Sequence, residues 1–383
     1  MTSSLGLPRG TNILVALGAA TLTAIGISSI RGILAPVLLT LILTICANPV
    51  RTGLLKRGVP GGIATGSVIL VVFGLLAGFT YTLILATAQF VAMLPNYQKQ
   101  FEQIGASIGA WLTSLGVGPD QVQAVEKGLT PSNLGHVISG LLGSVVSITG
   151  ALVIILTMMI LMAADAAYAH TILHQLGTRN PNLVSAVTDY ASNVRRYMVV
   201  TTVLGVVQGA LNSIALYILG VPAALLWGLL AFLCSFIPNI GYFFALIPPV
   251  VFGFLVGGWP TVIAVIVVYG IINAVVQSII QPRVVGHAVS LSQTITFFSV
   301  LFWAVVIGPI GAILAIPLTL LGKTILVDSD PDAHWWRPAL GPTTETRDLQ
   351  KAEEAEAKHE RKDRREAKKH PPSSGEPAPA DAA

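Results

Sequence analysis

The chain has 383 residues, of which 53% are hydrophobic and only 10% charged, and its mean hydropathy is +0.75. This profile is typical of an integral membrane protein with several spans, and it excludes a soluble globular domain. Only five of the 18 acidic residues precede residue 323, so the net charge of +4 describes the loops and the C-terminal segment and gives no indication of nucleic-acid binding.

The N-terminal region, residues 1–62, is predicted to be a hairpin of two spans. Its apolar runs are Asn12–Ile30 and Gly32–Ala47, and the first is too long for the apolar part of a cleaved signal peptide. The loop 48–62 carries three basic residues, Arg51, Lys56 and Arg57. Because basic loops stay on the cytoplasmic side, this loop and the N-terminus are expected inside the cell.

Residues 63–164 are predicted to hold the third and fourth spans. Ile63–Phe90 is the third, and its Gly74-x-x-x-Gly78 motif offers a face for close helix packing. The polar region 91–140 carries an apolar stripe at helical spacing, which predicts an amphipathic helix ending at Gly116 to Pro119, outside the cell. The fourth span then runs from about Leu141 to Ala164.

Residues 165–196 are predicted to form an amphipathic helix on the cytoplasmic surface. Asn180-Pro181 is a favourable helix start, and the segment leads into a fifth span, Tyr197–Leu219. On that span, Gln208 and Asn212 are four residues apart and therefore share a face. A polar face in a span points inward, either to hydrogen-bond a partner helix or to line a cavity.

Residues 197–322 are predicted to be the transport core. The stretch Leu219–Gly322 contains one charged residue, Arg283, yet proline and glycine interrupt it repeatedly, at Pro222, Pro238 with Gly241, Pro248-Pro249, Pro260, Pro282, Gly308-Pro309-Ile310-Gly311 and Pro317. Broken helices free backbone groups that lipid cannot satisfy, so these groups must meet protein or a water-filled cavity. Interrupted apolar segments of this kind are typical of a transport site.

The C-terminal segment, residues 323–383, is charged and is predicted to be a largely disordered cytoplasmic tail. Nine apolar runs would leave this basic tail outside the cell, so one run should enter the membrane and return. Thr294–Gly322, bent at Gly308–Gly311, would give two arms of ~21 Å. Pro222–Gly257 is the alternative hairpin. The predicted fold is an all-α integral membrane protein with about eight transmembrane helices, broken or re-entrant helices in the C-terminal half, and amphipathic surface helices.

Polar residues of the core are the candidate substrate path. Asn239 and Gly241 lie at the first break, and the other candidates are the ladder Asn273, Gln277 and Gln281 together with Gln208 and Asn212. Amides and carbonyls freed at Pro238–Gly241, Gly308–Pro309–Gly311 and Pro317 would supply further hydrogen bonds. Arg283 is either a positive-inside anchor or an attractor of anions. Asp165 and Arg195 are charge or gating candidates, although surface pairing of Asp165 or Asp189 with Arg195 or Arg196 is the ordinary interpretation.

Other function classes find less support in the sequence. A sodium/proton antiporter normally needs an intramembrane carboxylate or histidine, and Tyr197–Gly322 contains no carboxylate. An enzyme is not expected, because the chain has no His-Glu-x-x-His motif and no paired membrane aspartates. A passive channel or scaffold stays open, since pores and transport paths share polar linings. No metal or cofactor is expected, and a coupling ion would be H⁺ or Na⁺.

Several motifs in this chain resemble the autoinducer-2 exporter family of bacterial permeases, the PerM-like proteins. They are Arg31–Pro36, Asn48-Pro49, Arg57-Gly58-Val59-Pro60, Leu219-Gly220-Val221-Pro222, Ile237–Gly241, Gln277, Gln281-Pro282, Val285-Gly286, and Gly308-x-x-Gly311 to Ile316-Pro317-Leu318. Many members carry His-Pro where this chain has Leu291-Ser292-Gln293, so no role of that pair is transferred.

The resemblance implies a multispan permease that moves a small polar solute of the signal-molecule type. It also implies a homo-oligomer in the bacterial inner membrane, with both termini in the cytoplasm. Family members differ in role, and sodium/proton exchange is among the roles. The expected partners are the lipid bilayer, further copies of the chain and the solute, and no nucleic acid.

Overall fold

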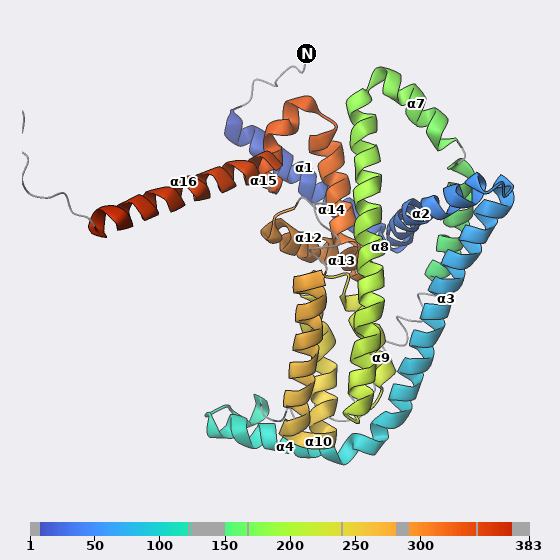
Figure 1. The fold of residues 1–383 in the computed structure, drawn as a ribbon. Coiled ribbons are helices and arrows are strands. Elements are labelled where there is room, and N and C mark those ends of the chain that lie inside the picture. Colours follow the sequence, from blue (N-terminus) through green and yellow to red (C-terminus); the bar gives the residue numbers. More distant parts are fainter. Residues whose placement is uncertain are drawn as a thin grey trace, which may run out of the picture.

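The computed structural model describes residues 8–121, 123, 150–166, 168–238, 240–280, 291–341 and 344–369. Within these residues every element is helical and no strand occurs, which confirms the predicted all-α class (Figure 1). Four helical stretches are long and apolar enough to cross a membrane: Arg31–Lys56, Gly61–Ser114, Pro181–Ile218 and Gly241–Gln277. Shorter apolar helices accompany them: Ile13–Ser29, Gly150–Asp165, Ala224–Cys234 and Gln293–Val306. The protein is therefore a multi-pass membrane protein.

The first two helices are α1 (Arg9–Ser29) and α2 (Arg31–Lys56). The predicted loop 48–62 is too long, because α2 continues through Pro49 to Lys56. A proline inside a helix leaves the carbonyl four residues earlier without its backbone donor. Here Arg195 of α8 supplies one, since its Nε donates to the Ile45 oxygen at 3.0 Å. This contact with a distant helix compensates for the missing N–H.

Helix α3 (Gly61–Met93) continues through η1 (Leu94–Tyr97) into the amphipathic α4 (Gln98–Ser114), which lies at the foot of α10 in Figure 1. The predicted stop is confirmed, because Gly116 adopts φ +83° directly after α4. The close-packing prediction for Gly74 and Gly78 is not met by the described residues, since a Cβ at either position would have no atom within 4 Å. The predicted start of the fourth span near Leu141 lies outside the described residues.

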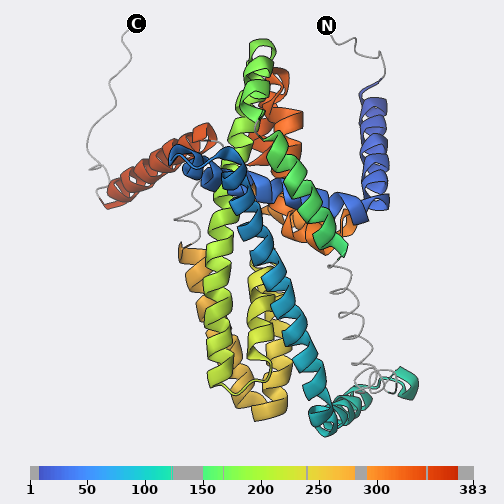
Figure 2. The same ribbon diagram turned by 90° about the vertical axis from the view of Figure 1, so that its right-hand side faces the viewer.

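Helix α7 (Ala169–Arg179) leads to α8 (Pro181–Ile218). The start at Pro181 is confirmed, but the surface helix and the fifth span form one continuous helix of 38 residues, which runs the height of the molecule in Figures 1 and 2. Residues 165–196 are therefore not one separate helix. Asn180 divides them, and the second part belongs to α8.

Helix α9 (Ala224–Cys234) packs closely on α8. The Gly205-x-x-x-Gly209 face makes this approach possible, because a Cβ on Gly209 would lie 2.7 Å from the Gly228 oxygen. Two residues with positive φ, Gly220 and Ala223, form the turn between the helices. The motif thus serves a helix contact inside the protein, as small residues at membrane-helix interfaces commonly do.

Helix α10 (Gly241–Asn273) is a hairpin, because Gly258 leaves helical geometry with φ 62° and ψ −155°. Its two arms lie side by side in Figure 1. The second arm continues into η2 (Ala274–Ile280), a π-helical turn. The sequence placed this interruption at Pro260, two residues after the observed reversal.

The last apolar run, Thr294–Gly322, is bent as predicted. Helix α12 (Gln293–Val306) ends before Gly308, which has φ 92°, and α13 (Pro309–Ile313) and α14 (Ala315–Lys323) fold back against α12. The alternative hairpin also exists, because α9 packs against α10 after the turn that follows Cys234.

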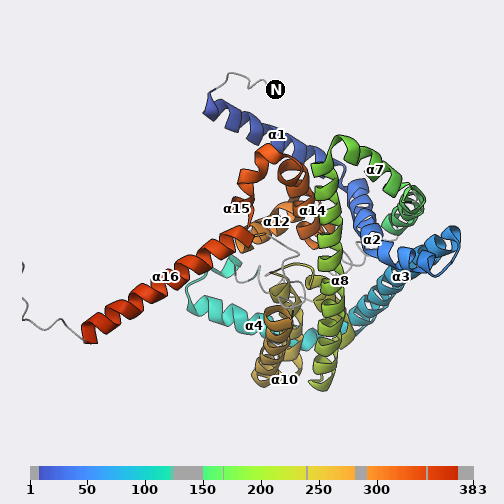
Figure 3. The same ribbon diagram turned by 45° about the horizontal axis from the view of Figure 1, so that its top comes forward.

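The C-terminal segment is more ordered than the sequence indicates. Its described residues form η4 (Thr324–Asp328), η5 (Pro331–Trp336), α15 (Arg337–Leu340) and α16 (Thr344–Lys369). Helix α16 projects away from the body in all three views (Figures 1, 2 and 3). Side-chain pairs four residues apart stabilise such a helix, as Gln350 Nε2 does by donating to Glu354 Oε1 at 3.0 Å. Residues 344–369 thus form a helix, whereas the sequence predicted a largely disordered tail for residues 323–383 as a whole.

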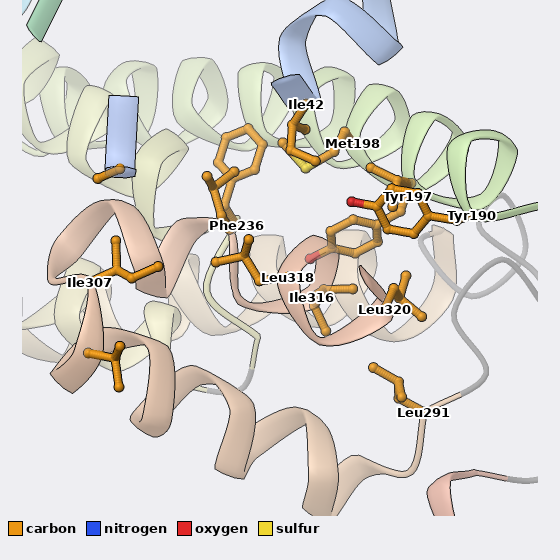
Figure 4. Packing of buried hydrophobic residues seen from close by; sticks show 14 residues of the cluster. Ile42, Tyr190, Tyr197, Met198, Phe236, Leu291, Ile307, Ile316, Leu318 and Leu320 are labelled. Atoms are coloured by element: carbon orange, nitrogen blue, oxygen red, sulfur yellow. The ribbon is translucent and has the colours of Figure 1, made fainter. Parts of the chain in front are cut away.

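Two hydrophobic cores flank α8. One joins Tyr190, Tyr197 and Met198 of α8 to Ile42 of α2 and to the bend around Ile316 (Figure 4). The other is aromatic and joins Phe90 of α3, Trp227 of α9 and Phe252 of α10, with ring centroids 5.0 Å apart from Phe90 to each of the other two. Helix α8 is thus the element against which both halves of the protein pack.

Candidate functional site

Two predicted path residues from different helices meet in the interior. Gln208 of α8 is buried, and its Nε2 donates to Oδ1 of Asn273, at the end of α10, at 3.4 Å. Asn212, one turn further along α8, is also buried. The interpretation of Gln208 and Asn212 as an inward polar face is therefore correct.

A small cavity adjoins this contact. Its volume is about 10 Å³, enough for about one water molecule, and its lining comes from α8, the end of α9 and η2: Thr201, Leu204, Gly205, Gln208, Ser235, Val276 and Gln277. Gln277 therefore lies beside Gln208, as a shared path requires. The π-helical turn carries Gln277, and such turns are frequent at functional sites.

Several oxygens around this cavity lack hydrogen-bond partners. Among the described residues, none donates to Gln208 Oε1 or Asn212 Oδ1, and none pairs with the Tyr269 hydroxyl of α10. Leaving a buried polar atom unpaired costs about 1–3 kcal/mol. Such atoms are rare in native proteins and usually have a functional partner or an ordered water. The site can therefore accept hydrogen bonds from a visiting polar molecule.

The break before α10 is a close-packed turn. Gly241 leaves no room for a side chain, because a Cβ there would collide with the Cys234 carbonyl. The turn also satisfies part of its own backbone, since the amide of Gly241 donates to the Ile237 oxygen at 3.0 Å and that of Ile240 to the Pro238 oxygen at 2.7 Å. Asn239 lies outside the described residues.

The break at Gly308 borders the hydrophobic core, since Val306 and Ile307 are buried, Gly308 is half-buried and Pro309 is exposed. The Gly308 amide donates to the Ala304 oxygen at 3.0 Å, and the Ala312 amide donates to the Gly308 oxygen at 3.1 Å. Gly311 packs against the Trp303 carbonyl, and Pro309 begins α13, where a missing N–H is harmless. Pro317 is fully buried. The bend thus satisfies these backbone groups locally and packs Gly311 and Pro317, whereas the sequence predicted freed groups that line a wet path.

The charged candidates have local roles in the structure. Arg195 bonds the Ile45 carbonyl, so its expected pairing with an aspartate is replaced by a backbone contact. Asp165 is exposed and forms no ion pair within the described part of the chain. Gln281 and Arg283 lie outside that part.

The sequence analysis missed two polar residues of the site, Thr201 and Ser235. Thr201 precedes Gln208 by seven residues, a spacing that repeats one helix face, so the sequence did contain a signal for it. Ser235 has no such signal, because its position depends on how α9 packs on α8. No cluster of three or more potential metal ligands occurs among the described residues.

Comparisons with known proteins agree with this architecture. Residues 12–329 match the model of the AI-2E transporter family. The putative transport protein YhhT of Escherichia coli (strain K12) is 26% identical over 318 residues, covering 82% of this chain and 90% of YhhT. The AI-2 transport protein TqsA of the same organism is 25% identical, covering 83% of this chain and 92% of TqsA. A putative transport protein of Haemophilus influenzae is 26% identical, covering 89% and 98%. This protein belongs to the AI-2E transporter family.

Proposed function

We propose that this permease exports a small polar solute along a path lined by α8, α10 and η2. The observation that carries the proposal is the meeting of Gln208 and Asn273 beside a cavity in which Gln208 Oε1 has no partner among the described residues. A polar cluster in a membrane protein is costly unless it serves a site.

The lining of the cavity favours an uncharged solute with hydroxyl groups. Its polar side chains are Thr201, Gln208, Ser235 and Gln277, and no described lining residue is ionisable. Amide oxygens accept hydrogen bonds from solute hydroxyls, whereas the side-chain hydroxyls both donate and accept. Because a relative is named an AI-2 transport protein, autoinducer-2 is the first solute to try.

The test uses the purified protein in lipid vesicles loaded with autoinducer-2. Gln208→Met and Asn273→Leu keep the side-chain volume but remove the amide, and we expect each to lower solute flux about tenfold, equal to ~1.4 kcal/mol. Leu211→Ile is the control, because Leu211 is an exposed neighbour of Asn212 on α8. Unchanged flux in both amide variants, with normal folding, would remove this cluster from the path.

A sodium/proton antiporter is the competing outcome of the same experiment. Vesicles with imposed sodium or proton gradients separate the two. If the vesicles show ion flux in the absence of solute, and if Gln208→Met abolishes that flux, the protein exchanges ions and the export proposal is wrong. Solute flux that either gradient accelerates would identify the coupling ion.

We also propose that both termini face the cytoplasm of a bacterial inner membrane. The density of basic residues in the loop before α3 and in α16 supports this orientation. A reporter that is active only in the cytoplasm, fused after Lys369, should be active. If instead a reporter that is active only outside the cell shows activity at this position, the C-terminus faces outward and the proposed orientation is wrong.

A further inference from the structure

The buried face of α8 carries a row of side chains with polar atoms, set among apolar residues such as Val194, Met198 and Leu216. Five of its side chains follow at intervals of seven, four, seven and four residues, which keeps them on one face: Tyr190, Tyr197, Thr201, Gln208 and Asn212. All five are at most 6% exposed. They extend over 22 residues, or ~33 Å of helix, which is close to the ~30 Å of a hydrocarbon core.

Tyr190, Gln208 and Asn212 each have an oxygen without a partner among the described residues, whereas the hydroxyls of Tyr197 and Thr201 lie close enough to interact with each other. Two other threonines of α8 can be compared with Thr201. Thr188 and Thr202 donate to the carbonyls four residues earlier, each at 2.7 Å, as helical threonines commonly do. Thr201 does not, so its hydroxyl stays directed into the interior, beside that of Tyr197. At about 1–3 kcal/mol for each unpaired group, the oxygens of Tyr190, Gln208 and Asn212 in one row are a substantial cost for a structural helix.

The two tyrosine hydroxyls extend this row beyond the cavity. In Figure 4 both point from α8 into the interior, toward the bend that carries Ile316 and Leu318. They lie on the Pro181 side of Thr201, whereas the cavity and Asn212 lie toward the Ile218 end. The opposite face of α8 is apolar and exposed, for example at Val203 and Val207, which suits contact with lipid.

We propose that this face, from Tyr190 to Asn212, is a continuous polar lane that water and the solute occupy in turn. For the solute, the inference rests on the proposed export function. The hydroxyls of Tyr190, Tyr197 and Thr201 receive the solute on the Pro181 side, and the amides of Gln208 and Asn212 hold it farther along. Because hydroxyls both donate and accept, the lane fits a small uncharged solute that carries several hydroxyl groups.

Water access is tested by cysteine labelling in a chain with Cys46→Ala and Cys234→Ala. Thr201→Cys and Asn212→Cys should react with a membrane-impermeant thiol reagent, because thiolate formation needs water. Val203→Cys and Val207→Cys on the lipid face should react at least about tenfold more slowly. This factor corresponds to a difference of ~1.4 kcal/mol in the free energy of exposing the thiol to water. Equal, slow labelling of Thr201→Cys and Val203→Cys in folded protein would overturn the lane.

A second test uses the chain with both native cysteines in place. Tyr197→Phe removes one hydroxyl and should lower flux of autoinducer-2 several-fold while leaving the melting temperature in place. The matched control is Tyr217→Phe on the same helix, because Tyr217 is 81% exposed. A lower melting temperature with unchanged flux would make the hydroxyl structural and would count against the lane.

The two proposals fail separately. Labelling of Thr201→Cys without flux of any solute supports a wet lane and contradicts export. Flux that Gln208→Met abolishes, with Thr201→Cys unlabelled, supports export and contradicts the lane beyond the cavity.

Discussion

Two hairpins in the C-terminal half reverse direction with nearly the same backbone geometry. In α10 the reversal is at Gly258, with φ 62° and ψ −155°, and between α12 and α13 it is at Gly308, with φ 92° and ψ −159°. This region is essentially restricted to glycine. In both cases a proline follows within two residues and helps the next helix to begin.

The surroundings of the two turns differ. The α10 turn is at the surface, where Trp259 is 67% exposed. The Gly308 turn is itself half-buried and Pro309 is exposed, but the chain then enters the interior, where Leu314 and Ala315 are fully buried and α13 and α14 contact α2 and α8. The same local sequence feature thus leads to an exposed tip in one hairpin and into a packed segment in the other. The comparison predicts that equal changes beside the two turns will have unequal effects.

The largest difference is expected at the glycines beside the two turns. Gly311→Ala would place a Cβ against the Trp303 carbonyl and 2.7 Å from the Ile307 Cβ, and overpacking of this kind costs about 3 kcal/mol. At Gly257 the added Cβ would meet only the Thr261 side chain, whose hydroxyl can rotate away while its Cβ stays 3.0 Å from the new atom, so Gly257→Ala should cost about 1 kcal/mol, less than Gly311→Ala.

Thermal unfolding in detergent measures both variants. Gly322→Ala is the control, because a Cβ there meets nothing within 4 Å. Equal losses at positions 311 and 257 would contradict the difference in packing.

The next-largest loss of stability is expected from substitution of the two turn glycines, Gly258 and Gly308. Gly308→Ala and Gly258→Ala both force alanine into a region that costs about 1–3 kcal/mol. An added Cβ meets no atom within 4 Å at Gly308 and only the Pro260 Cδ, at 3.9 Å, at Gly258, so backbone strain dominates at both turns. The two variants should therefore lower the melting temperature by similar amounts, and a clearly larger loss at either turn would contradict this.

A smaller effect is expected from the hydrogen bond that ties the arms of the buried hairpin together. Trp303 Nε1 donates to Thr319 Oγ1 at 3.0 Å, from α12 to α14. Trp303→Phe and Thr319→Val should each cost about 1 kcal/mol, and the double variant should cost less than their sum. Strict additivity in denaturation experiments would show that the bond contributes nothing.

The smallest effect is expected at the exit of the buried hairpin, where Asp328 pairs with Lys323 at 3.3 Å and with Arg337 at 2.9 Å. Arg337→Gln should cost about 0.2–1 kcal/mol and lose its effect in high salt. Lys351→Gln is the control, since its contact with Asp348 is 3.9 Å long and well exposed. An effect of Arg337→Gln that salt leaves unchanged would point to a role other than the ion pair.

Much of the fold followed from local patterns in the sequence. Apolar runs predicted the all-α membrane class, Asn180-Pro181 predicted the start of α8, and Gly116 and Gly308 predicted a stop and a bend. Gln208 and Asn273 were recognised as candidates because polar residues are costly within spans. Each of these signals depends on residues that are neighbours in the chain.

Only the tertiary structure decided which partner each group meets. Helix α2 continues through Pro49 because Arg195, 150 positions from Ile45, bonds the freed carbonyl. The segment after Gly308 is buried because α13 and α14 contact α2 and α8, and Ser235 lines the cavity because α9 packs on α8. Hydropathy and turn chemistry act over a few residues, whereas a buried polar group is satisfied by whatever the fold brings within about 3 Å.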